Sequence, residues 1–247
     1  FADLTAAEFK QTYLGLKPQQ NMNALPQAEI PDIEIPKNFD WRKKNVITEV
    51  KDQGSCGSCW AFSTTGNIEA LWALKNGDLI SLSEQELLDC DTLDSACSGG
   101  LMTKAYKAII SLGGLESEKD YPYKAYEKTC SFKKKKVVVT ISGGVNITSN
   151  EKKMAKWLVK NGPLSIGINA DNMQLYSSGI AHPSTSDCDP VFLDHGVLIV
   201  GYGVQKKTPY WIVKNSWGPS WGEEGYYRVY RGDGTCGLNT MVSSAVI

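Results

Sequence analysis

The chain has 247 residues, of which 42% are hydrophobic and 21% are charged, and its formal net charge at pH 7 is −1. This composition is ordinary for a globular protein, and the near-zero charge argues against nucleic acid or an anionic membrane surface as an electrostatic partner. No apolar run approaches the roughly 20 residues that a membrane-spanning helix needs, so we expect no membrane partner either. The length suffices for one large domain or two modest ones.

The cysteine pattern points to an oxidising compartment. Seven cysteines stand at positions 56, 59, 90, 97, 130, 188 and 236. An odd number at wide spacing predicts three disulfides and one spare thiol, as in proteins of the secretory route. The sequon Asn146-Ile147-Thr148 fits the same route and predicts glycosylation at Asn146. Because the chain starts at Phe1 with neither Met nor a signal peptide, we expect that it is truncated or processed upstream.

The first 34 residues differ from the rest. Thr5 followed by Glu8 forms a capping box, which predicts a short helix. From Lys17 to Glu34 the chain contains three prolines and no hydrophobic periodicity, so it is expected to be an extended linker. Without a cysteine this segment cannot be joined to the body by a disulfide, and we expect an appendage.

A mostly helical half follows. With Ser58 as N-cap, a helix is predicted from Cys59 to about Lys75, ended by Asn76-Gly77. Its expected apolar face is Ala61, Ile68, Leu71, Trp72 and Leu74. Ser83 and Glu86 predict a second capping box, for a short helix toward Cys90. A third helix is predicted from about Leu101 to Ser111, with Ala105, Ile109 and Ile110 inward and Gly113-Gly114 as its stop.

The later half is dominated by short β-type runs. Apolar or β-branched segments separated by Gly and Pro predict strands at 137–141, 164–170, 191–200, 210–214, 225–230 and 242–246. A single amphipathic helix, 151–160, interrupts them. Helices followed by strands, without regular alternation, predict an α+β fold rather than a parallel sheet.

The Cys56-Gly57-Ser58-Cys59 string admits several interpretations. It could be a redox pair, half of a zinc site, or a nucleophile at a helix N-terminus. A redox pair needs a thioredoxin-like βαβ setting, which the later sequence does not continue. A zinc module lacks a second close cysteine pair, since Cys90 and Cys97 lie seven apart.

A catalytic cysteine needs a base, and the chain has two histidines. His182 stands in the polar loop 179–190 and is expected to be exposed. His195 stands in the apolar run 191–198, where an imidazole must be paired to be tolerated. A buried histidine satisfied by the backbone remains an alternative at this point. His195 follows Cys59 by 136 positions, which matches the spacing of papain-type enzymes.

Three motifs together resemble the papain family of cysteine proteases. They are Gln53 to Trp60, Leu193-Asp194-His195-Gly196, and Asn215-Ser216-Trp217-Gly218. Residues 35–42 are similar to the start of the mature enzymes, and the resemblance continues to Ile247. It implies a peptidase domain at 35–247 and, at 1–34, the remnant of a propeptide. The implied fold has a helical left domain (about 44–145), a β-barrel-like right domain (about 146–247) and the active-site cleft between them.

The resemblance also implies catalytic roles. Cys59 would be the nucleophile, with the helix dipole favouring its thiolate. His195 would pair with that thiolate and later protonate the leaving amine, while Asn215 orients the imidazole under the cover of Trp217. The Gln53 amide and the Cys59 backbone N–H would stabilise the oxyanion of each step, and the acyl-enzyme would be a thioester. A homologue that has lost activity and serves as a binder or inhibitor stays an alternative.

By the same resemblance, the disulfides are Cys56–Cys97, Cys90–Cys130 and Cys188–Cys236, which leaves Cys59 as the spare thiol. Substrate contacts are expected from Gly99, Gly100, Leu101, Met102, Gly167, Leu193, Asp194, Gly196, Trp217 and Met241. The apolar side chains and the glycines of this set predict a pocket for Leu, Val or Phe at the second residue before the cut, with poor acceptance of Arg. No insertion resembling an occluding loop follows Cys97, which favours an endopeptidase.

The resemblance further implies a zymogen that is cut between about Ala28 and Ile35 at acid pH. Expected partners are protein and peptide substrates, the chain's own propeptide and cystatin-type inhibitors, with neither a cofactor nor a metal, and the enzyme is expected to be a monomer. Its expected location is lysosomal or secreted.

Overall fold

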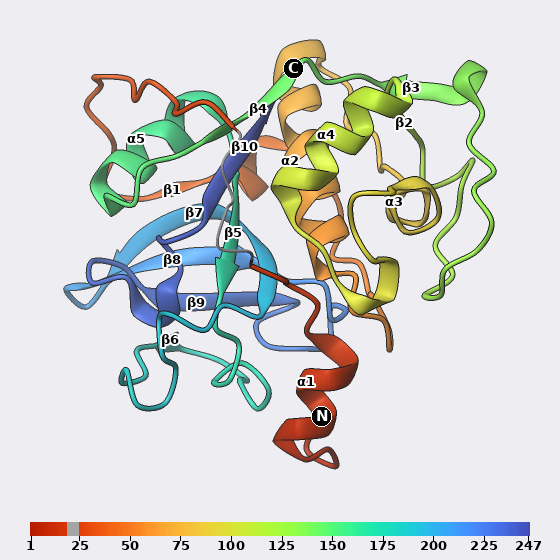
Figure 1. Cartoon of the computed structure of the whole chain (residues 1–247). Coiled ribbons are helices and arrows are strands. Elements are labelled where there is room, and N and C mark those ends of the chain that lie inside the picture. Colours follow the sequence, from red (N-terminus) through yellow and green to blue (C-terminus); the bar gives the residue numbers. More distant parts are fainter. Residues whose placement is uncertain (19–24) are drawn as a thin grey trace.

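The computed structural model describes residues 1–18 and 25–247 (Figure 1). The expected linker residues 19–24 lie outside this description. The α-helices are α1 (Ala6–Tyr13), α2 (Cys59–Asn76), α3 (Glu84–Cys90), α4 (Met102–Leu112) and α5 (Glu151–Asn161). The strands are β1 (Phe39–Asp40), β2 (Leu115–Glu116), β3 (Val137–Val139), β4 (Gly143–Asn146), β5 (Leu164–Ile168), β6 (Ile180–Ala181), β7 (His195–Gln205), β8 (Thr208–Lys214), β9 (Tyr226–Tyr230) and β10 (Val242–Val246).

The architecture is the α+β class predicted from the sequence. In Figure 1, α2, α3 and α4 form one side of the molecule and the large sheet forms the other, with α1 at the end near the N-terminus. The sheet has the strand order β4-β10-β5-β7-β8-β9-β6, and β1 pairs with β7. Its neighbours are antiparallel, except for β6 and β9. β2 and β3 form a separate small sheet.

The long strand β7 is central to the position of the site. It runs antiparallel to β8, with Leu198 opposite Lys214. His195, the first residue of β7, and Asn215, which follows β8, therefore lie at the same end of the strand pair. β5 flanks β7 on its other side and places Gly167 opposite Gly196.

Two hydrophobic clusters form most of the core. One joins the large sheet to α5 through residues such as Met154, Leu158 and Trp211. The other surrounds α2 and α4. The N-terminal segment contributes Phe9 and Leu14 to the first cluster and Leu16 to the second, and all three side chains are buried. The expectation of a loose appendage is therefore wrong, because the apolar side chains around the helix are absorbed into the core.

Helix starts follow the predicted caps in two cases out of three. The Thr5–Glu8 capping box is present in both directions. Ser83 Oγ accepts from the Glu86 N–H, but Glu86 does not return the bond, since its carboxylate accepts from the Glu116 N–H. Ser58 occupies the N-cap position of α2 without capping it, because its hydroxyl is paired with the Tyr123 hydroxyl at 2.6 Å.

Burial differs from prediction along two helices. α2 is buried continuously from Cys59 to Leu71, because α3, α4 and the sheet pack around it, so the expected single apolar face is too narrow. Leu74, expected inward, is exposed at the end of the helix. Ile110 on α4 was also expected inward and is exposed, whereas Ala105 and Ile109 are buried as predicted.

Strand boundaries shift where turns intervene. The strand expected at 191–200 begins at His195, because Val191 and Phe192 belong to an exposed turn. β4 was not predicted, since two glycines open it and glycine is rare in strands. It pairs with β10 over Gly143–Asn146, so the boundary expected near residue 146 between the two halves falls at the end of a strand of the large sheet.

Three disulfides join Cys56 to Cys97, Cys90 to Cys130, and Cys188 to Cys236. They are the pairs that the family resemblance implies. Cys59 is the free cysteine and is buried. Throughout residues 1–18 and 25–247, we find no helix with both the length and the apolarity needed to cross a membrane.

Candidate active site

Cys59 opens α2 and lies where the helical side meets the sheet. Its Sγ accepts a hydrogen bond from the Gly196 N–H at 3.3 Å, and its side chain is completely buried. Gly196 suits this position because a side chain there would press on Trp60 and Met102. Since Cys56 is bonded to Cys97, a redox pair of Cys56 with Cys59 is not formed.

His195 is buried at the start of β7 and is held from two sides. Its Nε2 lies 2.7 Å from Asn215 Oδ1. That oxygen also accepts from the Ser216 N–H, so it serves as an acceptor and Nε2 carries the proton. The Trp217 ring stacks on the imidazole with centroids 4.6 Å apart. Nδ1 has no hydrogen-bond partner among the described residues and is left to act as a base.

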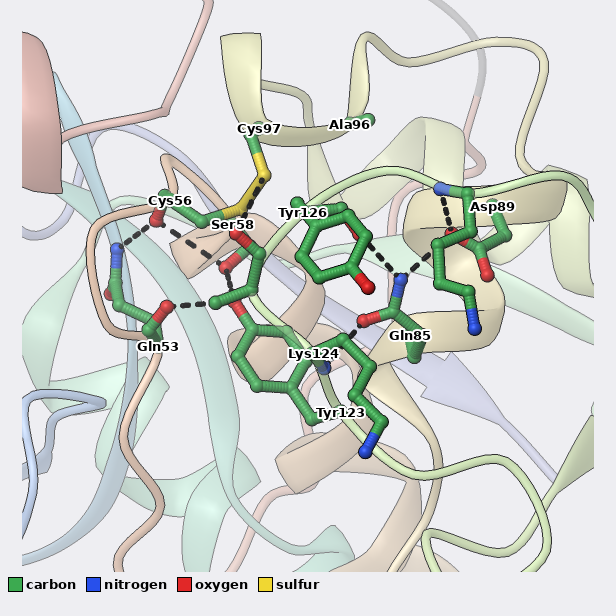
Figure 2. Close-up of a disulfide and its surroundings, with 12 residues drawn as sticks. Gln53, Cys56, Ser58, Gln85, Asp89, Ala96, Cys97, Tyr123, Lys124 and Tyr126 are labelled. Atoms are coloured by element: carbon green, nitrogen blue, oxygen red, sulfur yellow. Dashed lines mark hydrogen bonds between the residues drawn. A yellow bond between two sulfur atoms is a disulfide. The ribbon is translucent and has the colours of Figure 1, made fainter.

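The Gln53 amide is fixed at both ends, and Figure 2 shows its NH₂ end beside the Cys56 carbonyl. Its Oε1 accepts from the Ser216 hydroxyl at 2.7 Å, which forces the NH₂ group to the opposite side. The NH₂ group donates to the Cys56 carbonyl at 2.8 Å and to the Tyr13 carbonyl at 2.9 Å. Tyr123 donates to the Gln53 backbone carbonyl and also contacts Ser58, which braces this loop. One N–H of the Gln53 amide is therefore held by the Cys56 carbonyl, and the other donates to the Tyr13 carbonyl of the N-terminal segment.

Residues 13–17 of the N-terminal segment cross the site between its two walls. On the helical wall, the Gly100 N–H donates to the Gly15 carbonyl, and the Lys17 N–H donates to the Gly100 carbonyl. On the β wall, the Leu16 N–H donates to the Asp194 carbonyl at 3.0 Å. The pairing of Leu16 with Gly100 is parallel. The segment thus forms a backbone ladder with both walls.

Gly15 and its surroundings allow a close backbone approach. A Cβ on Gly15 would lie 1.8 Å from the Gly57 carbonyl oxygen, and one on Gly99 would lie 2.5 Å from the Gly15 carbonyl. Side chains at these positions would separate the segment from the helical wall. The segment lies close enough to Cys59 for the Gly15 N–H to act on the pKa of its thiol.

Leu16 fills the pocket expected to select substrate. It shares one buried cluster with Leu101, Met102, Leu193 and Met241. A Cβ added to Gly167 would lie 2.8 Å from Leu16 Cδ2, so the absence of a side chain at 167 makes room for it. The structure therefore brings the predicted pocket residues together around a leucine.

Burial sets the charges of the catalytic pair in this form. Burial raises the pKa of Cys59 to about 11, although the Gly196 and Gly15 N–H groups act in the opposite direction. Burial lowers the pKa of His195 to about 4, against the hydrogen bond to Asn215. The Cys59 thiol and the His195 imidazole are thus both neutral near pH 7. The helix position had predicted a thiolate, but desolvation beneath residues 13–17 outweighs the dipole here.

Acidic groups tie the N-terminal segment to the β wall. Burial raises the pKa of Asp194 to about 6, and its Oδ1 accepts from the Ala170 N–H. Lys10 on α1 pairs with Asp171 at 2.6 Å. Further along, the rings of Phe1 and Phe9 both lie nearly perpendicular to the Trp217 ring, with centroids 5.3 and 5.2 Å from it. Trp217 thereby contacts both His195 and the N-terminal segment.

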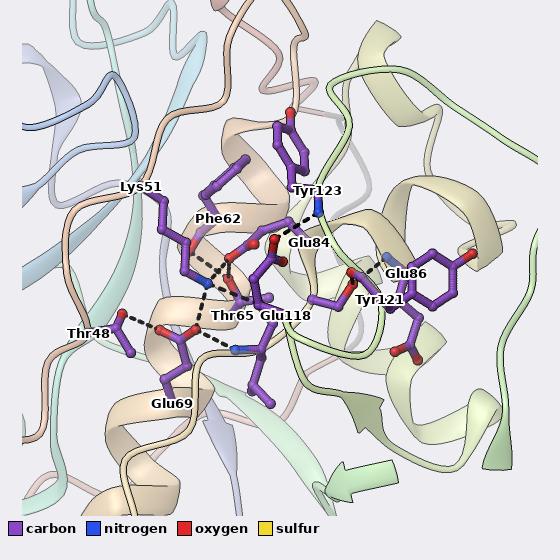
Figure 3. Close-up of polar contacts among 12 residues, drawn as sticks. Thr48, Lys51, Phe62, Thr65, Glu69, Glu84, Glu86, Glu118, Tyr121 and Tyr123 are labelled. Atoms are coloured by element: carbon purple, nitrogen blue, oxygen red, sulfur yellow. Dashed lines mark hydrogen bonds and ion pairs between the residues drawn. The ribbon is translucent and has the colours of Figure 1, made fainter. Parts of the chain in front are cut away.

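Behind the site lies a buried ionic cluster that the sequence did not predict (Figure 3). Lys51 Nζ contacts Glu69 at 2.9 Å and Glu84 at 2.7 Å. Glu69 also accepts from the Thr48 hydroxyl, which in turn accepts from Lys214 at 2.9 Å. Lys214 directly precedes Asn215, so the cluster connects α2 and α3 to the strand end that carries Asn215.

The remaining candidates lie apart from this site. His182 is half-exposed, contacts Asp233 at 2.7 Å and stacks on Tyr230, as expected for a surface histidine. Asn146 is half-buried at the end of β4. Within the described ranges, no group of three or more His, Cys, Asp or Glu residues could hold a metal ion.

Sequence reasoning missed several residues of the site. Tyr13, Gly15 and Leu16 were assigned to an appendage, although the Leu-Gly-Leu pattern of 14–16 offers two apolar anchors around a close-approach glycine. Ser216 and Tyr123 hold Gln53 through contacts over 163 and 70 positions of sequence, which no local pattern reveals.

Comparisons with known proteins agree with this geometry. The family described as papain family cysteine protease matches residues 35–246. Cathepsin F of Drosophila melanogaster is 56% identical over the whole of this chain and 42% of its own length. Cathepsin F of Mus musculus is 54% identical over the whole chain and 54% of its length. The chain therefore spans about half the length of these relatives. Cysteine proteinase 15A of Pisum sativum is 48% identical over 99% of this chain and 72% of its own.

Solved proenzyme structures have the same fold. Digestive procathepsin L2 from the larval midgut of Tenebrio molitor matches with a TM-score of 0.93 and 35% identity, covering 100% of this chain and 82% of that one. The proform of the ragweed pollen cysteine protease Amb a 11 matches with a TM-score of 0.91 and 38% identity, covering 100% and 78%. With its cathepsin F-like sequence and this fold, the chain belongs to the papain family of cysteine proteases.

Proposed function

We propose that the protein is the latent form of a cysteine endopeptidase that hydrolyses peptide bonds through a thioester on Cys59. The observation that carries the proposal is the convergence at one point of Cys59, from the start of α2, and the His195–Asn215 pair, from the sheet. The Gly196 N–H joins the two walls at Cys59 Sγ, 3.3 Å away, and the His195–Asn215 contact measures 2.7 Å. A histidine satisfied by backbone would not leave Nδ1 unpaired, and the residue after His195 donates its N–H to the buried thiol.

The first half of the reaction forms the acyl-enzyme once residues 13–17 have left. The Cys59 thiol passes its proton to His195 Nδ1, and the thiolate attacks the substrate carbonyl carbon. The oxyanion accepts from the Cys59 N–H and from the Gln53 NH₂ group, which the Tyr13 carbonyl occupies in the latent form. The imidazolium then protonates the departing amine, the C–N bond breaks and a thioester remains.

Hydrolysis completes the cycle with the same groups. A water molecule attacks the thioester and gives a proton to His195. The carbon–sulfur bond breaks, the acid product leaves, and the proton returns to Cys59. Asn215 Oδ1 holds His195 Nε2 throughout, so Nδ1 stays aimed at the reacting atoms.

We propose a preference for Leu, Val or Phe at the second residue before the cut. The pocket around Leu16 is apolar, and the missing side chain at Gly167 leaves it room. A guanidinium would find no partner there, so Arg should be accepted poorly. Gly100 would pair with the backbone of the substrate, as it does with residues 15 and 17 here.

Residues 1–34 are proposed to be the remnant of an inhibitory propeptide that is removed at acid pH, with the cut between about Ala28 and Ile35. Support comes from the occupied oxyanion donor, the filled pocket and the proenzyme structures of the same fold. We further propose a monomer that acts on protein and peptide substrates, is inhibited by cystatin-type proteins, and resides in the lysosome or is secreted as a glycoprotein.

Treatment of the acid-activated protein with a thiol-directed epoxide tests the function. We expect one adduct, on Cys59, together with loss of hydrolysis of a Leu-Arg peptide substrate. Hydrolysis that survives Cys59→Ala would refute the proposal. An adduct on Cys59 without any hydrolysis by the untreated protein would instead support a homologue that has lost activity.

A further inference from the structure

The Tyr123 hydroxyl joins the two parts of the chain that carry the proposed oxyanion donors (Figure 2). One donor is the side-chain NH₂ group of Gln53, and the other is the backbone N–H of Cys59. The Tyr123 hydroxyl donates to the Gln53 backbone carbonyl at 2.8 Å. It also lies 2.6 Å from the hydroxyl of Ser58, the residue before Cys59. A single side chain therefore contacts both parts.

The direction of these two hydrogen bonds follows from the groups that make them. A backbone carbonyl can only accept, so Tyr123 gives its one hydrogen to Gln53. The Ser58 hydroxyl then donates to the Tyr123 oxygen, which is nearer to it than the Cys56 carbonyl at 3.4 Å. The bonds run from Ser58 through Tyr123 to Gln53, and each one polarises the next.

Ser58 directs its hydroxyl to this chain of bonds and not to the helix. It occupies the N-cap position of α2, yet its side chain makes no capping hydrogen bond. A serine at this position usually accepts from an N–H of the first turn and so stabilises the helix. Gln53 and Ser58 are both completely buried, so bulk water cannot take the place of the Tyr123 hydroxyl.

Tyr123 is itself fixed relative to the start of α2. Its backbone N–H donates to Glu118 Oε1 at 2.8 Å. Its ring packs edge-on against Phe62, one turn after Ser58, with the centroids 4.9 Å apart. Ser216 holds Gln53 from the β wall, through its hydroxyl and its backbone carbonyl. Tyr123 holds the same residue from the helical wall.

We propose that Tyr123 is a positioning residue of the oxyanion site, whose hydroxyl fixes the distance between the Gln53 NH₂ group and the Cys59 N–H. An oxyanion must accept from both donors at about 2.7–3.1 Å, so a change in their separation weakens at least one of the two bonds. Tyr123 acts through Gln53 and Ser58, and not on the substrate itself. The inference rests on the proposed function, because the separation matters only if Cys59 forms a tetrahedral intermediate.

Tyr123→Phe, assayed after removal of the N-terminal segment, tests the proposal. The ring and its contact with Phe62 remain, and only the hydroxyl is lost. We expect kcat for a Leu-Arg peptide to fall about tenfold and KM to change by less than about twofold, since the donors act in the transition state. Tyr121→Phe is the matched control, because its hydroxyl is bonded to Asp89 at 2.8 Å and to Ser131 at 3.0 Å, away from the oxyanion site. It should leave kcat within about twofold of the parent.

Reaction of Cys59 with a dipyridyl disulfide separates a positioning role from a general loss of structure. This reagent has no carbonyl group and needs only the thiolate, so its rate in Tyr123→Phe should stay within about twofold of the parent. Ser58→Ala breaks the same chain of bonds at its other end. It should also lower kcat without slowing the reagent, and it carries the test if Tyr123→Phe does not fold. A fall in kcat that the disulfide reaction matches would overturn the proposal, and so would a kcat equal to that of Tyr121→Phe.

A double-mutant cycle with Gln53→Ala identifies the route of the effect. Once the Gln53 amide is absent, the Tyr123 hydroxyl has no side-chain donor left to position. Tyr123→Phe should then lower kcat by less than about twofold in the Gln53→Ala chain, against about tenfold in the parent. Equal factors in the two backgrounds of an active enzyme would contradict this inference alone. A parent chain that shows no hydrolysis at all would contradict the proposed function, and the inference with it.

Discussion

At Gln53, one amide is oriented by a single hydroxyl. Because the Ser216 Oγ donates to Oε1, the NH₂ group must point toward Tyr13, where a carbonyl oxygen already sits. In the latent form, the neutral Tyr13 carbonyl oxygen therefore occupies the position proposed for the oxyanion. A donor fixed in this way loses no freedom when charge develops, which is why the proposed role as oxyanion donor suits Gln53.

Gln53→Ala should lower kcat by about 10²–10³, because the oxyanion loses one of its two donors in the transition state. KM for a Leu-Arg peptide should change little, since the ground-state carbonyl is bound weakly there. Steady-state kinetics after removal of the N-terminal segment measure both constants. Ser216→Ala is the matched control. It keeps the Gln53 donor and removes only the hydroxyl that orients it, so it should lower kcat by less than about tenfold. A loss confined to KM in Gln53→Ala would contradict the assignment.

Two buried groups oppose each other in the response to acid. Burial lowers the pKa of His195 to about 4 while the segment is docked, and we expect departure to restore its ordinary 6.5 and so to take up a proton between these values. Lowering the pH through that window favours departure. Asp194 has a pKa of about 6 in the docked form, above its ordinary 3.8, so it holds its proton more tightly there. The same fall in pH then favours docking.

Asp194→Asn removes the opposing group while keeping an oxygen that can accept from the Ala170 N–H. Acid should therefore release the segment more steeply, so that the ratio of opening in the variant to opening in the parent rises about tenfold between pH 7 and pH 5. Hydrogen exchange of the Leu16 amide, compared at equal pH in chains carrying Cys59→Ala, measures the opening. A ratio that stays constant from pH 7 to pH 5 would show that Asp194 does not titrate with docking.

At the scale of elements, residues 13–17 act as a strand held between two walls. The backbone ladder supplies direction, and the buried side chains of Leu14 and Leu16 supply hydrophobic free energy, with Leu16 in the pocket between the walls. Fully burying a leucine contributes about 1.5–3 kcal/mol. Docking of the segment should therefore depend more on this side chain than on any one of the exposed residues beside it.

Leu16→Ala should weaken docking by about 2–4 kcal/mol, since truncation leaves a cavity among Met102, Leu193 and Met241. In the uncut chain at pH 7, a thiol-directed epoxide should then modify Cys59 about 10²-fold faster. Lys17→Ala is the control, because it keeps the same backbone ladder and changes an exposed side chain. Equal modification rates in the two variants would exclude Leu16 as the anchor.

The elements also show what sequence reasoning can reach. The three family motifs contain the residues that the structure brings together, since Cys59 opens α2, His195 opens β7 and Asn215 follows β8. The burial of α2 on all sides could not be predicted, because its Ser, Thr and Glu residues are typical of an exposed helix face unless their hydrogen-bond partners are known. The role of Leu16 was missed because a docked segment has no hydrophobic periodicity. The prediction of Ser58 as a capping residue was wrong because its hydroxyl is bonded to that of a distant residue, Tyr123.

For the whole molecule, the ionic cluster joins the two sides behind the catalytic residues. It consists of Thr48, Lys51, Glu69, Glu84 and Lys214, which come from four separate parts of the chain. In a linear sequence each of these residues is typical of a solvated surface, which explains why the cluster was not predicted. The two carboxylates beside Lys51 differ in their pKa. Against the effect of burial, Lys51 lowers the pKa of Glu69, whereas burial keeps the pKa of Glu84 raised.

Glu69→Gln and Glu84→Gln form a matched pair that tests this difference. Both remove one carboxylate beside Lys51, with the same change in volume. Glu69 is ionised and also faces Thr48 and the Leu82 N–H, so its neutralisation leaves Lys51 and Lys214 poorly compensated and should cost about 3–5 kcal/mol. Glu84 resists ionisation because it is buried, and one of its oxygens has no partner among the described residues, so Glu84→Gln should cost less than about 1.5 kcal/mol. Urea unfolding at pH 7, in chains that carry Cys59→Ala, gives both free energies. Equal losses in the two variants would mean that Lys51 is shared evenly between two ionised carboxylates.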